Sequence, residues 1–205
     1  AAVDHEKGYR WDIVASADQA GNFVIPELRD SSFIPKLRAG LDFGFALPWK
    51  HSSIWFYNSA GTANGNRLNN LAYYYFGGFG NNYVDDREVK RYRNFYSMPG
   101  FEIDEISAQR FVKSVAEWNL PPVRFESVGT PGFYLGWIRP AVFFAALKTD
   151  PGKSYDRWFT SAGLQLDLHF TVSHSHAMTL SVGYAAGFQS GKKRDDEIMI
   201  SLKIL

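Results

Sequence analysis

The stretch from Thr160 to Phe188, "TSAGLQLDLHFTVSHSHAMTLSVGYAAGF", decides the fold because apolar residues alternate in it with small or polar ones. In its first half, from Ala162 to Val172, every second residue is apolar and the residues between are Gly, Gln, Asp, His and Thr. After the short "SHSH" break, the alternation returns from Ala177 onward. Successive side chains of a strand point to opposite faces. The stretch therefore predicts two β-strands joined by a tight turn, each with one apolar face.

The composition of the whole chain agrees with an all-β protein. Its 205 residues suffice for one domain with a sizeable core. Aromatic residues make up 17% of the chain and there are 18 glycines, a mixture that favours β-structure over helix bundles. A net charge of +1, from 22 basic and 21 acidic residues, excludes the basic footprint of a nucleic-acid-binding protein. The absence of cysteine excludes disulfide scaffolds and thiolate metal sites.

Eight segments of the chain have the character of strands, and the connections between them differ in length. The predicted strands are 8–17, 33–47, 51–63, 106–119, 132–148, 157–173, 176–189 and 195–205. Short turns follow most even-numbered strands, whereas polar loops follow odd-numbered ones, and the longest runs from Asn64 to Glu105. Strands in soluble sheets are usually about five or six residues long. Long antiparallel strands with unequal loops are typical of an outer-membrane barrel, here of about eight strands in a single domain spanning residues 1–205.

The alternation assigns each strand residue to one of two faces of this barrel. The apolar face is predicted to meet lipid, and its members include Leu41, Phe43, Leu164, Leu166, Leu168, Leu180, Val182 and Tyr184. The polar face is predicted to line the lumen, with Lys36, Arg38, Asp42, Lys113, Glu117, Gln165, Asp167 and His169. We therefore expect arginine to impair insertion at Leu166 or Leu180 but to be tolerated at Gln165. A soluble ligand-binding barrel would have the same alternation with the apolar face turned inward.

Several motifs extend this pattern into a family resemblance. They are "RPAVFFAALK", "AGLQLDLHFTV" and "DEIMISLKIL" in the last third, and "YYYFGGFG", "SMPGFE" and "AEWNLPP" in the middle. With these motifs the chain resembles the bacterial surface antigen superfamily, the sixteen-stranded barrels of the outer-membrane assembly factor and the two-partner-secretion transporters. The resemblance implies that the chain corresponds to the last eight strands of such a barrel. It also implies that the long loop folds back into the lumen.

The tip of the long loop departs from the pattern of that superfamily. In the superfamily, an arginine before a Gly-aromatic pair docks on an aspartate of a neighbouring strand. Here the tip reads Met98, Pro99, Gly100 and Phe101, and the aspartate position is taken by alanine, at Ala145 or Ala146. Both charges of the ionic contact are absent together. We therefore expect the tip to be held by apolar packing alone, and Glu117 is carried over only as a residue that faces the lumen.

Residues with recognisable chemistry are few. His169, His174 and His176 surround a turn, so they are interpreted as turn and lumen residues rather than as metal ligands. The acidic group of Glu102, Asp104 and Glu105 is interpreted as solvated loop. No catalytic residue, metal site or cofactor is predicted.

The resulting functional hypothesis is a non-enzymatic barrel of the bacterial outer membrane, acting as an anchor or as a translocation or assembly pore. Its expected partners are outer-membrane lipids and lipopolysaccharide, together with a second barrel half or a second copy of the chain, and no nucleic acid. The alternatives are a small lipid-modifying enzyme, which would need a Ser/His/acid group at the lipid interface, and the soluble barrel. The sequence leaves open whether the eight strands close alone.

Overall fold

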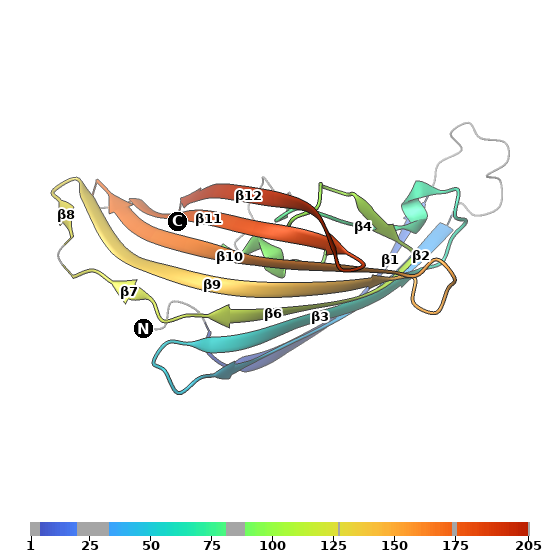
Figure 1. Cartoon of the computed structure of the whole chain (residues 1–205), viewed down its shortest axis with the longest axis horizontal. Coiled ribbons are helices and arrows are strands. Elements are labelled where there is room, and N and C mark those ends of the chain that lie inside the picture. The colour runs from blue at the N-terminus through green and yellow to red at the C-terminus, as the bar shows by residue number, and fades with distance from the viewer. Residues whose placement is uncertain (1–4, 20–32, 81–88, 127, 174–175, 205) are drawn as a thin grey trace.

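The computed structural model describes residues 5–19, 33–80, 89–126, 128–173 and 176–204 and is all-β. Eight long strands form one antiparallel sheet in which each strand pairs with the next (Figure 1). They are β1 (Gly8–Gln19), β2 (Phe33–Ala46), β3 (Ser53–Ala63), β6 (Arg110–Asn119), β9 (Phe133–Thr149), β10 (Arg157–Val172), β11 (His176–Gln189) and β12 (Lys192–Ile204). The eight predicted strands and their order are confirmed within this part of the chain. The predictions for His174 and Leu205 lie outside the described residues.

The described residues also include shorter elements. Two short strands, β4 (Tyr74–Phe76) and β5 (Ile106–Ala108), pair with each other in a second sheet. Two 3-10 turns, η2 (Asn70–Ala72) and η3 (Arg91–Arg93), lie in the long connection after β3. The strands β7 (Val123–Arg124) and β8 (Gly129–Thr130) pair with β9. Over the described ranges, no helix is long and apolar enough to cross a membrane.

One predicted loop is wrong. The polar segment after Gln189 was expected to be a long loop, but β11 and β12 are joined by a two-residue turn at Ser190 and Gly191. Both residues have positive φ, 50° and 80°, as a type I′ hairpin turn requires. The charged residues from Lys192 to Glu197 therefore belong to β12, and a bulge beside Gly187 accommodates them.

The long sheet is open. Among the described residues, β1 and β12 each have one neighbouring strand, so they form the two edges of the sheet. The prediction is thus correct for the strand number, strand order and antiparallel pairing, whereas closure into a barrel is not seen. Because the number of long strands is even, β1 and β12 run in opposite directions. Each edge could therefore pair with a further antiparallel strand.

The two faces of the sheet differ sharply in their surroundings. The outer face carries exposed apolar side chains: Leu164 is 52% exposed, Ile198 72% and Ile200 73%. The eight residues predicted to meet lipid all lie on this face by strand parity, either exposed or half-buried. The inner face holds the buried polar residues, among them Gln165 at 0% exposure and Glu117 at 1%. The inner face also holds buried apolar residues, such as Phe143 at 2% and Leu147 at 0% exposure, so the sheet differs from a soluble one chiefly in the apolar side chains that stay exposed on its outer face.

Glycines on the inner face make room for large neighbouring side chains. Gly61 lies opposite Phe111, and a Cβ at Gly61 would overlap the Phe111 ring. Gly163 lies opposite Phe143, and a Cβ there would overlap that ring in the same way. The rings therefore reach over the glycines of the neighbouring strand, which explains why the inner face combines very small residues with large ones.

Candidate functional site

The inner face is covered by a plug, which we define as residues 64–80 and 89–105. Its β4 and η3 lie inside the curve of the sheet (Figure 1). Tyr92 of the plug stacks on Phe143 of β9 with ring centroids 4.1 Å apart. Phe76 meets Phe111 of β6 edge-to-face at 4.8 Å. The main hydrophobic core of the described structure therefore lies between the plug and the sheet. The described parts of the long loop therefore fold against the inner face of the sheet.

The Tyr92 phenol is part of this core and remains neutral. Burial raises the pKa of the Tyr92 phenol well above its ordinary value of 10.0, and the negative charge of Glu117 raises this pKa further. A neutral phenol costs less to bury than a phenolate. Tyr92 therefore serves as a packed ring in residues 89–95, which we call the base of the plug.

The base of the plug is bound to β6 by a buried ion-pair network. The Arg93 guanidinium donates from Nε to Oε2 of Glu117 at 2.7 Å and from Nη2 to Oε1 at 2.6 Å, a two-point contact. Lys90 Nζ lies 3.5 Å from the same carboxylate and also donates to the Asn119 side chain. The side chains of Glu117 and Arg93 are 0% and 10% exposed. Glu117 thus lies on the inner face of the sheet, and it has cationic partners that the sequence reasoning missed.

Lys113 adds a second contact between β6 and the plug. Its ammonium donates to the carbonyl oxygens of Asn94 at 2.8 Å and Phe95 at 3.0 Å, and also to that of Ser97. An ammonium group has three protons to donate, and three carbonyls receive them. Lys113 therefore fixes the backbone that leads from the base of the plug to its tip.

The tip, residues 98–101, contacts β10 and β12 through polar groups as well as apolar ones. The Ser161 hydroxyl donates to the Pro99 carbonyl, and the Gly100 N–H donates to Oε2 of Glu197 at 3.1 Å. The Phe101 ring packs edge-to-face on Phe159 at 5.7 Å. The prediction of purely apolar packing is wrong, because backbone groups of the tip find partners on the wall. Ala145 lies in the core.

Two glycines let the tip approach the wall closely. Gly100 has a φ of 84°, a conformation that favours glycine, and a Cβ there would overlap the backbone of Gly187. A Cβ at Gly187 would in turn overlap the Gly100 carbonyl oxygen. The backbone of the tip thus lies directly on β11 with no side chain between them.

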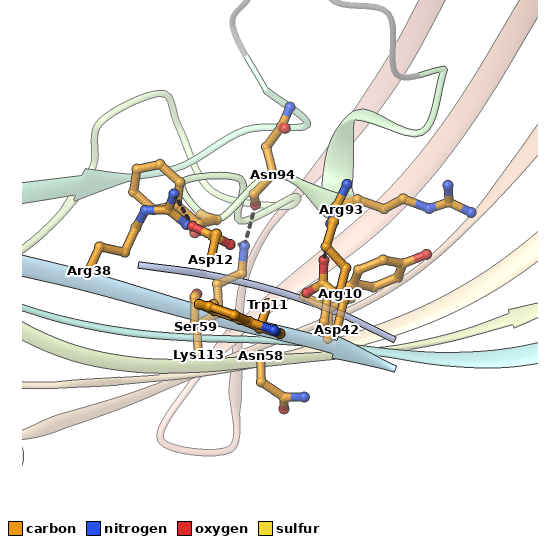
Figure 2. A pocket seen from close by; sticks show the side chains of 14 residues that line it. Arg10, Trp11, Asp12, Arg38, Asp42, Asn58, Ser59, Arg93, Asn94 and Lys113 are labelled. Carbon is orange, nitrogen blue, oxygen red and sulfur yellow. Dashed lines mark hydrogen bonds and ion pairs between the residues drawn. The ribbon is translucent and has the colours of Figure 1, made fainter. Parts of the chain in front are cut away.

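A cavity of about 340 Å³ lies between the plug and strands β1–β3 and β6. Ion pairs between β1 and β2 line it: Arg10–Asp42 at 2.7 Å and Arg38–Asp12 at 2.6 Å. Figure 2 shows these two pairs on either side, with Lys113 reaching toward Asn94 between them. A third pair, Lys36–Asp18 at 2.7 Å, continues the series. The predicted lumen residues of β2 are therefore paired across the two strands rather than free.

The predicted lumen residues of β10 form a separate group. The Gln165 amide donates to Asp167 Oδ1 at 2.6 Å and to the Val89 carbonyl at 3.3 Å, and the Ser181 hydroxyl donates to Asp167 at 2.7 Å. His169 stacks on Trp137 at 5.2 Å. The expectation that arginine is tolerated at Gln165 is wrong, because the plug leaves no space there. The eight predicted lumen residues do not converge on one site.

The described residues offer little for metal binding or for nucleophilic catalysis. Within the ranges that the structure describes, no cluster of three or more His, Cys, Asp or Glu could hold a metal ion. His51 Nδ1 lies 2.9 Å from Glu6, but the hydroxyl of the adjacent Ser52 donates to the Asn119 carbonyl. His51 and Ser52 thus have separate partners.

Comparison with known proteins does not assign the chain. No protein-family model matches it, no curated protein matches it, and no solved structure matches it. A functional argument must therefore start from the two contrasting faces of the sheet and from the plug.

Proposed function

We propose that the chain is part of the wall of a plugged outer-membrane β-barrel, which anchors its protein in the bacterial outer membrane and acts as a translocation or assembly pore without catalysis. The observation that carries this proposal is the exposed apolar outer face, opposite an inner face on which charged and polar side chains are buried beside the apolar core. Monomeric soluble proteins rarely expose large contiguous apolar areas. A barrel in lipid has an apolar exterior and a polar interior.

The dimensions of the strands support the same function. About 9–11 residues of a tilted strand span a membrane, and β9 and β10 have 17 and 16 residues. Aromatic side chains lie near both ends of the outer face. Trp158 stands at the start of β10, while Trp49 and Trp118 lie 6.3 Å apart at the opposite end. Such aromatic girdles mark the two interfaces of membrane barrels.

The plug favours a barrel wider than eight strands. The interior of an eight-stranded barrel is about wide enough for side chains alone, whereas this inner face accommodates the plug with its own short sheet. An unpaired strand edge is not tolerated in lipid. We infer that further strands pair with β1 and β12, as in the surface antigen superfamily that the chain resembles. The mass of the detergent-solubilised particle shows whether these further strands come from a second copy of the chain or from a second half of the same protein.

A charge on the outer face tests the membrane assignment. Leu164→Arg is expected to cost about 2–4 kcal/mol of folding free energy in lipid, because Leu164 lies near the middle of β10. The measurement is denaturant unfolding of the protein folded into phospholipid vesicles. Leu164→Ala controls for lost contacts. Leu68→Arg places the same charge on an apolar residue that is 72% exposed outside the strands. If the two arginine variants insert and unfold alike, the outer face does not meet lipid, and the soluble barrel is the better assignment.

A further inference from the structure

On the basis of the proposed pore function, we propose that the inner face of β1 and β2 lines a water-filled passage that runs past the plug and attracts anions. The passage contains the cavity of about 340 Å³ shown in Figure 2 and a second cavity of about 380 Å³. Four residues line both cavities, which therefore adjoin each other: Arg10, Asp42, Tyr57 and Arg93. The second cavity reaches Gly8, where β1 begins. We call the two cavities together the recess.

The described part of the plug covers the inner face of the sheet unevenly. Ser161 and Gln165, on β10, are completely buried beneath it. On β1, by contrast, the side chains of Arg10 and Asp12 are 74% and 42% exposed although both form ion pairs. Ion pairs that keep this much exposure are hydrated and stabilise the fold only slightly. Water therefore reaches the inner face of β1 while the plug is in place.

The hydrated pairs continue along most of β1. Three pairs between β1 and β2 follow one another from the start of β1 toward its end: Arg10–Asp42, Arg38–Asp12 and Lys36–Asp18. At about 3.3 Å per residue, Arg10 and Asp18 are roughly 26 Å apart along the strand. The apolar band of a membrane barrel is about 25 Å tall and its strands are tilted. The series of charges therefore covers most of the thickness of the membrane.

The recess carries more positive than negative charge. Its lining holds five cationic side chains and two carboxylates, namely Lys7, Arg10, Arg38, Arg93 and Lys113 against Asp12 and Asp42. The Glu117 carboxylate offsets Arg93, and the balance remains positive. A charged recess with low-dielectric walls concentrates ions of the opposite sign. We therefore expect small anions and anionic groups to enter it more readily than cations.

The passage does not require the plug to move. The plug is bound to β6 through Arg93 and Lys113, and to β12 through the Gly100 N–H. A further strand at β1 would bond to the edge of that strand in the plane of the sheet, so it would leave the inner face uncovered. The recess would thus stay open beside a plug that remains in place.

Single cysteines test the recess directly, because the chain contains no cysteine. Ser59→Cys places a thiol in the recess, Ser181→Cys places one on the buried inner face of β11, and Ser154→Cys lies in an exposed loop. In detergent, Ser59→Cys should react on the order of tenfold or more faster than Ser181→Cys, which reacts only when the structure opens. The ratio of anionic to cationic methanethiosulfonate rates should be on the order of tenfold higher at Ser59→Cys than at Ser154→Cys.

Currents across planar lipid bilayers then test whether ions use the recess. The reversal potential in a KCl gradient should show anion preference, and the anionic reagent should lower that preference in Ser59→Cys but not in Ser154→Cys. Reaction of Ser59→Cys as slow as that of Ser181→Cys, or an equal reagent ratio at Ser59→Cys and Ser154→Cys, would overturn the proposal. A protein that inserts without carrying current contradicts the passage alone. A protein that does not insert contradicts the proposed function itself.

Discussion

Replacing Glu117 with alanine should destabilise the protein by about 3–5 kcal/mol and free the base of the plug. The substitution removes the shared partner of Arg93 and Lys90, whose cationic groups are almost fully buried. Neither group can recover water while the plug stays in place, so the plug must leave or the charges remain uncompensated. Denaturant unfolding measures the loss of stability, and protease sensitivity of residues 89–97 measures the release.

A double-mutant cycle separates the ion pair from general damage. Arg93→Ala alone should be nearly as harmful as Glu117→Ala, because each leaves a buried charge of the network short of a partner. Combining the two should cost clearly less than the sum of the single changes. Additive costs would mean that the two side chains act independently and that their ion pair does not hold the base of the plug.

Phe111→Ala has the second large expected effect, again about 3–5 kcal/mol, because it leaves a cavity in the core between plug and sheet. The Phe111 ring is 1% exposed and contacts the rings of Tyr74, Phe76 and Phe95. It also fills the space beside Gly61, which has no side chain to fill the gap. The site can therefore collapse only a little. Denaturant unfolding in detergent gives the magnitude.

The neighbouring residue supplies the control for Phe111. Val112 lies on the outer face and is 50% exposed, so Val112→Ala should cost less than about 1 kcal/mol in detergent. Equal costs at the two positions would contradict the assignment of the faces in β6. A small cost at Phe111 would mean that the plug does not pack against this strand.

Strand alternation was sufficient to predict the sheet. It located the eight strands because a curved sheet with two unlike faces imposes a period of two on every strand. It was least clear in β6, where Phe111 and Val115 are apolar on the polar face. Both are buried against the plug, so their apolar character reflects a third layer that the alternation does not encode. The polar residues after Gln189 were mistaken for a loop because their charges outweighed the turn signal of Ser190 and Gly191.

The contacts of the plug were harder to predict. Arg93 stands seven positions before Gly100, whereas the expectation looked for arginine directly before that glycine. Glu117 was predicted to face inward. A search for cationic loop residues able to pair with its carboxylate could therefore have found Arg93. Glu197 had no such signal, since its partners are backbone N–H groups of Phe79 and Gly100. Every residue except proline has a backbone N–H, so no pattern of side chains in the sequence predicts this contact.

The large sequence separation of the contacts made by Glu197 also sets an order of events during folding. Its two hydrogen bonds join residues that are 118 and 97 positions apart in the chain, whereas Arg93 and Glu117 are 24 apart. Closing long loops delays the contacts that depend on them. The base can therefore form as soon as β6 is in place, but the tip must wait until β12 has paired with β11. The tip of the plug would thus be fixed last, by an edge strand of the sheet.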